Sequence, residues 1–178
     1  MSQWKKWLCV LAMLLPLCVQ AATKDEVDIR VDSVLREFFR SNPMYKSLGE
    51  KAYGILVFPS VLKAGLVVGG EYGEGALTKD GKITDYYSTM SASFGFQIGA
   101  EERSEIIMFM DKDAFDRFKK GDGWSAGVDG SITVMNIGLG KVLNTDTIQD
   151  PIIAFVYSNK GFMGNFSLEG TKFTKTYR

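Results

Sequence analysis

The spacing of apolar residues predicts two helices early in the chain. Thr23-Lys24-Asp25-Glu26 has the spacing of a capping box, and apolar residues then recur at helical intervals until Ser41-Asn42-Pro43. The residues at those intervals are Val27, Val31, Val34, Leu35 and Phe38. Charges of both signs on the polar side favour packing on the protein's own core over lying on a membrane. A shorter helix is expected from Pro43 to about Lys51, because proline is tolerated at the first helical position.

The pattern then becomes that of β-strands. Three short apolar runs lack alternation and are expected to be buried on both faces. They are Tyr53 to Phe58, Ile106 to Met110 and Ile152 to Tyr157. From Tyr86 to Ala100 the even positions are mostly apolar, which predicts one strand whose even side faces the core. Asp111 to Lys120 reads as a short helix with acidic residues at its start. The fold class expected is α+β, with N-terminal amphipathic helices packed on a curved, mostly antiparallel Gly-rich β-sheet or open barrel.

The glycine-rich stretch GLVVGGEYGEG, residues 65–75, is interpreted as a strand and not as a phosphate-binding loop. It is not followed by Lys-Ser or Lys-Thr, it lacks the G-x-G-x-x-G spacing, and no helical pattern follows it. Its glycines instead predict a strand that coils sharply or that another backbone approaches closely.

The first 21 residues have the features of a secretory signal peptide. Lys5 and Lys6 precede a short apolar run, and Ala21 suits a cleavage site. Processing as a lipoprotein at Cys18 is the alternative. Both cysteines fall within this segment, so the mature chain is expected to be an exported, thiol-free single domain of residues 22–178. The expected locations are the periplasm or the outside of the cell, with peripheral attachment to a membrane as an option.

Composition narrows the chemistry. The chain has 21 basic and 21 acidic residues, so its net charge gives no argument for nucleic acid as a partner. It contains no histidine, the commonest general base and a common metal ligand, and we predict neither a cofactor nor a metal site. Gly123-Trp124-Ser125-Ala126-Gly127 matches the G-x-S-x-G nucleophile motif, but a base for Ser125 and a following helix are both missing from the pattern. A Gly-rich strand start is the preferred interpretation, and we do not expect an enzyme.

Lysines at strand ends and at the end of the third predicted helix are the candidate binding residues. They are Lys63, Lys119, Lys120, Lys160, Lys172 and Lys175. Such lysines commonly protect sheet edges from aggregation. If several converge, each can contribute about 1 kcal/mol near an anionic membrane.

Four segments in order resemble the SYLF domain family, the lipid-binding module also found in eukaryotic SH3-containing actin-patch proteins. They are Gly54 to Pro59 with Lys63-Ala-Gly65, GGEYGEG from Gly69, SASFGFQIGAE from Ser91, and PIIAFVYSNKGFMGNFSLEGTKFTK from Pro151. The resemblance implies a non-catalytic domain that binds membrane lipids, phosphoinositides in the eukaryotic members, with actin bound by some. The predicted signal peptide marks an exported, bacterial-type member, for which actin is an improbable partner.

We therefore expect a lipid-binding module that recognises anionic, phosphoinositide-like headgroups at a membrane surface, with any protein partner unknown. Three alternatives remain at this stage: a small outer-membrane β-barrel, a periplasmic structural or interaction protein, and a serine hydrolase that uses Ser125.

Overall fold

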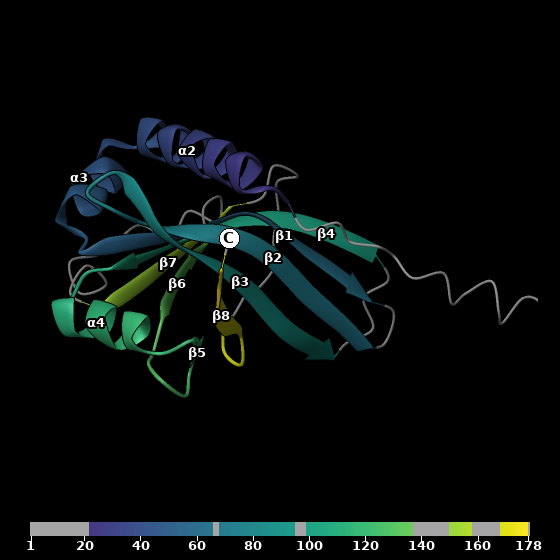
Figure 1. Ribbon diagram of the computed structural model, residues 1–178. Coiled ribbons are helices and arrows are strands. Elements are labelled where there is room, and N and C mark those ends of the chain that lie inside the picture. Colours follow the sequence, from purple (N-terminus) through teal and green to yellow (C-terminus); the bar gives the residue numbers. More distant parts are fainter. Residues whose placement is uncertain (1–21, 66–67, 95–98, 137–149, 158–167, 178) are drawn as a thin grey trace, which may run out of the picture.

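The computed structural model describes residues 22–65, 68–94, 99–136, 150–157 and 168–177. In these residues a strongly curled, eight-stranded sheet carries helices on both faces (Figure 1). Helices α2 (Lys24–Ser41) and α3 (Pro43–Lys51) cover one face, and α4 (Lys112–Lys120) lies on the other. The predicted α+β class, with N-terminal helices on a curved and mostly antiparallel sheet, is confirmed.

The helices begin where the local signals place them. Thr23 and Glu26 form the predicted capping box, in which the Thr23 backbone nitrogen donates to the Glu26 carboxylate at 2.9 Å. Asn42 caps α3 by accepting from the Met44 backbone nitrogen at 2.9 Å. Asp111 caps α4 in the same way, accepting from Ala114 at 2.9 Å. Each cap satisfies a backbone donor that the first helical turn leaves without a partner.

The sheet has the strand order β5-β8-β3-β2-β1-β4-β7-β6. Its strands are β1 (Gly54–Gly65), β2 (Val68–Lys79), β3 (Lys82–Phe94), β4 (Gly99–Phe109), β5 (Gly123–Ser125), β6 (Thr133–Asn136), β7 (Ile152–Tyr157) and β8 (Lys172–Thr176). All neighbours are antiparallel except β6 and β7. The two edge strands β5 and β6 are joined by only residues 126–132, so the short connection requires the two edges of the sheet to approach each other.

Two hydrophobic cores lie on opposite faces of the central strands. The three runs predicted to be buried on both faces form the start of β1, the end of β4 and β7, which are neighbours in the sheet; Tyr53, just before β1, is exposed and is the exception. Val57 and Ile106 contribute to the core beneath α2 and α3. Leu56 and Ile107, which are the sequence neighbours of Val57 and Ile106, contribute to the core beneath α4. Burial on both faces explains the absence of alternation in these runs.

Two predictions for residues 86–100 are wrong. The segment is not one strand, because β3 ends at Phe94 and β4 begins at Gly99. The even side is also not the core side of β3: Tyr87 is 2% exposed, whereas Met90 is 59% exposed. The reason is that the face bearing Tyr87 packs against Phe118 of α4, while the face bearing Met90 lies toward α2 and is left uncovered there.

Residues 68–75 of the glycine-rich stretch lie in strand β2, as predicted, whereas Gly65 ends β1; the glycines of β2 permit close backbone approach. A Cβ atom on Gly75 would lie 2.0 Å from the Val57 carbonyl oxygen, and one on Gly73 would lie 2.8 Å from that of Ser60. The close approach falls beside the register shift between Val57 and Ser60, where β1 bulges against β2. Larger residues at 73 and 75 would force these strands apart.

Replacing the capping residue of α2 tests how far this helix supports the fold. We expect Thr23→Ala to lower the free energy of unfolding by about 1 kcal/mol, because the backbone nitrogen of Glu26 loses its acceptor. Urea denaturation followed by circular dichroism measures the loss, with Ser33→Ala in the same helix as the control. Equal unfolding midpoints for the two variants would contradict the prediction.

Two sequence predictions lie outside the described residues: the signal peptide of residues 1–21, with both cysteines, and Lys160. Within the described ranges, the helices are too short or too polar to cross a membrane.

Candidate functional site

Two of the predicted lysines converge on one carboxylate. Lys119, near the end of α4, places Nζ 3.0 Å from Oδ2 of Asp85 in β3. Lys175, from β8, places Nζ 2.7 Å from Oδ1 of the same side chain. The two lysines are far apart in sequence and meet because β8 pairs with β3, with Lys175 opposite Tyr87.

The contacts favour the charged forms of Asp85 and Lys175. Burial alone would raise the pKa of Asp85, but hydrogen bonds from Lys175 and Lys119 outweigh this effect and lower the pKa to about 2. The same hydrogen bond raises the pKa of Lys175 above its ordinary value. One carboxylate thus holds two ammonium groups, and the group as a whole keeps a positive charge.

A third lysine, which the sequence analysis missed, lies beside these two. Nζ of Lys79 is 5.7 Å from the centre of the Phe115 ring, and Nζ of Lys119 is 5.8 Å from it. Lys120 follows directly at the exposed end of α4. We call Lys79, Lys119, Lys120 and Lys175 the α4 basic surface. Lys79 precedes the Asp80-Gly81 turn between β2 and β3, and this turn position was the available sequence signal.

The other predicted lysines do not join this surface. Lys172 is exposed and alternates along β8 with the buried Phe173, so it points to the opposite sheet face. Lys63 lies on β1, with Nζ 3.5 Å from Glu71. Of the five candidates within the described residues, Lys119 and Lys175 meet on Asp85, Lys120 follows Lys119 at the end of α4, and Lys63 and Lys172 are separated from them.

Lys63 contacts one end of a buried charge network on the face that carries α4. Arg103 donates from Nε to Oε1 of Glu105 at 3.0 Å, and its Nη2 is 2.9 Å from the same oxygen. Nη2 also donates to Glu71. The side chains of Arg103 and Glu105 are each 1% exposed, and Glu71 receives a further hydrogen bond from Ser91 at 3.1 Å. Sequence analysis missed this network, which connects β4, β2 and β3.

The two carboxyls of the network titrate in opposite directions. Burial raises the pKa of Glu105 to about 7, although the Arg103 guanidinium opposes the shift. Burial also acts to raise the pKa of Glu71, but hydrogen bonding and charge from Arg103 outweigh it, and the pKa lies below its ordinary value. Arg103 and Glu71 therefore form the permanent ion pair, and Glu105 can take up a proton near neutral pH.

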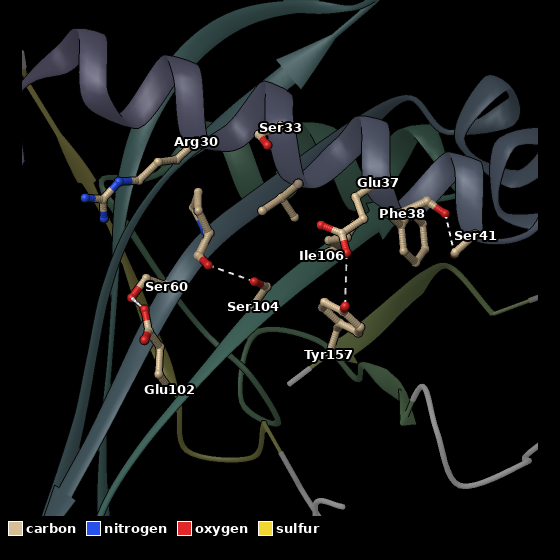
Figure 2. A pocket seen from close by; sticks show the side chains of 12 residues that line it. Arg30, Ser33, Glu37, Phe38, Ser41, Ser60, Glu102, Ser104, Ile106 and Tyr157 are labelled. Carbon is tan, nitrogen blue, oxygen red and sulfur yellow. Dashed lines mark hydrogen bonds between the residues drawn. The ribbon is translucent and has the colours of Figure 1, made fainter. Parts of the chain in front are cut away.

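A groove of about 480 Å³ runs along the side of α2 (Figure 2). One wall is a single face of α2, and the other consists of β1, β4 and the end of β7. Its apolar lining is formed by Val34, Phe38, Pro59 and Ile106. Its polar lining is formed by Arg30, Ser33, Glu37, Ser41, Ser60, Glu102, Ser104 and Tyr157. This volume lies in the range of small-molecule sites.

The G-x-S-x-G motif lies in a strand followed by a turn. Ser125 ends β5, and its carbonyl accepts from the Asp129 backbone nitrogen at 2.9 Å, which closes the turn at Gly127. The preferred interpretation, a strand start, is confirmed. A nucleophile elbow instead places its serine between a strand and a helix.

The fold and these sites define an α+β domain with a curled sheet, a basic surface and a side groove. The family model described as "Ysc84: Las17-binding protein actin regulator" matches residues 90–177. A curated relative, beta cell expansion factor A of Aeromonas veronii, is 33% identical over 128 residues, which is 68% of this chain and 48% of the relative. The chain thus spans about half the length of that relative. It belongs to the SYLF (Ysc84) family, whose domain is of the lipid-binding type.

Proposed function

We propose that this protein is a non-catalytic domain that binds anionic, phosphate-bearing lipid headgroups at a membrane surface through the α4 basic surface. The observation that carries the proposal is the meeting of lysines from α4, β8 and β2: Lys119 and Lys175 on Asp85, and Lys79 with Lys119 about Phe115. Family membership supports lipid as the class of ligand.

The geometry suits a multivalent anion in contact with several ammonium groups. Asp85 bonds two of the four lysines and fixes their side chains, which lowers the entropy that a ligand must remove on binding. Asp85 and the nearby Asp122, which also acts on Lys175, supply two carboxylates against the four ammonium groups. Because lysines near an anionic membrane contribute about 1 kcal/mol each, this surface supplies enough attraction for reversible binding.

Vesicle co-sedimentation tests the proposal. We expect the protein to sediment with vesicles that contain anionic phospholipid, to ignore neutral phosphatidylcholine vesicles, and to be released by high salt, because exposed charges are screened. The double variant Lys119→Ala/Lys120→Ala should bind anionic vesicles roughly 30-fold more weakly, from the loss of about 1 kcal/mol per lysine.

The matched control is Lys46→Ala/Lys51→Ala, which removes two exposed lysines from α3 on the opposite sheet face. It has the same net charge as the first double variant. Equal loss of binding in both would show that bulk charge, and not the α4 basic surface, is responsible. Absence of binding to anionic vesicles by the unaltered protein would overturn the proposed function.

A further inference from the structure

Four of the five hydroxyl groups that line the groove beside α2 direct their protons at protein acceptors, and Ser33 is the fifth. Ser60 donates to Oε1 of Glu102 at 2.6 Å, and Tyr157 donates to Oε1 of Glu37 at 3.1 Å (Figure 2). Ser104 donates to the Pro59 carbonyl at 2.7 Å, and Ser41 to the Phe38 carbonyl at 2.7 Å. Each hydroxyl has one proton and two lone pairs, so these groups offer a ligand acceptors and no donors.

The charged residues on the groove walls also favour a ligand that donates hydrogen bonds. Glu37 and Glu102 contribute two carboxylates against the single guanidinium of Arg30. Arg30 precedes Glu37 by seven residues, about 10 Å along the helix axis, and its side chain extends away from Glu37 in Figure 2. Within the described residues, Glu37 has a hydrogen bond from Tyr157 and no ion pair. The complementary ligand group is therefore a cation that donates hydrogen bonds.

The apolar residues of the groove indicate the chemistry of the other part of the ligand. Val34 and Phe38 from α2 and Ile106 from β4 line the groove beside Glu37 and belong to the core beneath α2 or pack against it. Such a surface favours an alkyl chain or another apolar group.

We propose that this groove binds a protonated primary amine carrying an apolar group, with the ammonium at Glu37 and Tyr157 and the apolar part against Val34, Phe38 and Ile106. The site is separate from the α4 basic surface and does not depend on the function proposed for it. The same ammonium chemistry occurs in the ethanolamine headgroup of phospholipids and in free alkylamines, and the experiment distinguishes these sources.

An NMR titration of the protein with hexylamine tests the site. We expect saturable shifts confined to resonances of the groove. Hexanol, which keeps the alkyl chain but lacks the charge, should bind at least about tenfold more weakly than hexylamine, and hexanoate should not bind. Equal binding of hexanol and hexylamine would overturn the proposal, because the groove would then select only for the apolar chain.

Three variants locate the contact. Glu37→Gln should weaken hexylamine binding about tenfold, since the charge-assisted hydrogen bond is lost while the shape is kept. Asp32→Asn, an exposed substitution on α2 outside the groove lining, should leave binding unchanged. Ser33→Trp should fill the groove and abolish binding, and its exposed position keeps the fold intact. Unaltered affinity in Glu37→Gln would overturn the proposal.

Vesicles identify the source of the amine. If phosphatidylethanolamine in otherwise neutral vesicles recruits the protein, and Glu37→Gln abolishes this, the lipid headgroup is the ligand. If only hexylamine binds, the site takes a free amine. Hexylamine binding should persist in Lys119→Ala/Lys120→Ala, so failure of the α4 basic surface and failure of the groove give different results. No binding of either amine source overturns the groove proposal alone.

Discussion

We expect Arg103→Met to lower the free energy of unfolding by about 3 to 5 kcal/mol at pH 7.5. Arg103 is buried and bonds the carboxylates of Glu71 and Glu105, which are themselves buried. Methionine fills much of the same volume but leaves Glu105 without a cation and Glu71 with only Lys63, whose Nζ is 3.5 Å away, in a region of low dielectric constant. The loss is therefore a desolvation cost and not a packing defect, and urea denaturation followed by tryptophan fluorescence measures it.

A triple variant separates these causes. Adding Glu71→Gln and Glu105→Gln to Arg103→Met removes both buried charges, and most of the stability should return. Arg117→Met, an exposed arginine on α4, is the matched control and should change stability by less than about 0.5 kcal/mol. A loss below about 1 kcal/mol in Arg103→Met would show that solvent reaches the two carboxylates.

The helices and the buried strands could be predicted because their signals are local. The capping box of Thr23 and Glu26, the proline at the start of α3 and the cap at Asp111 each act within four residues. Strands buried on both faces also reveal themselves by an unbroken apolar run, as in β7. For such elements the tertiary structure adds support to what the sequence already specifies.

The orientation of β3 could not be predicted because a period of two defines two faces but does not say which one is covered. Tyr86 and Met90 share a face, and α2 approaches only the first: Tyr86 donates to Asp28 at 2.7 Å, while Met90 is exposed. Coverage depends on where a helix ends over the sheet, which is a property of the whole fold.

The candidate sites were predicted in part for the same reason. Their residue type was visible, but their grouping depends on strand order. Lys119 and Lys175 meet only because β8 returns to pair with β3, and Lys172 is separated from them by the alternation of side chains along β8. The spacing of Arg103 and Glu105 places both on one face of β4, which was a usable signal, whereas Glu71 reaches them from two strands away. The groove beside α2 exists only between elements.

The second large effect is a pH dependence that arises from Glu105. Its pKa is raised from 4.5 in the unfolded chain to about 7 in the folded protein, chiefly by burial. Below pH 4.5 the carboxyl is protonated in both states, and the stability associated with the neutral form is fully present. This stability is lost as the pH rises through 7, by roughly 3 kcal/mol for a shift of this size. We expect the free energy of unfolding to fall as the pH rises from 4.5 to about 7.

The other carboxylates with shifted pKa values change the free energy of unfolding only at lower pH. Glu71 and Asp85 have lowered pKa values, so their contributions are present above the unfolded values of 4.5 and 3.8 and are lost only at lower pH. The chain has no histidine, whose titration would otherwise overlap. Glu71 remains the partner of Arg103 when Glu105 is neutral.

Glu105→Gln provides the comparison, because glutamine imitates the neutral carboxyl and can still accept from Arg103. Urea denaturation of both proteins from pH 5 to pH 8 should give a nearly flat curve for the variant and a falling curve for the unaltered protein. The variant should be the more stable of the two at pH 8. Parallel curves would contradict the prediction. They would mean that Glu105 stays ionised in the folded protein from pH 5 to pH 8, because its contact with Arg103 outweighs the effect of burial on its pKa.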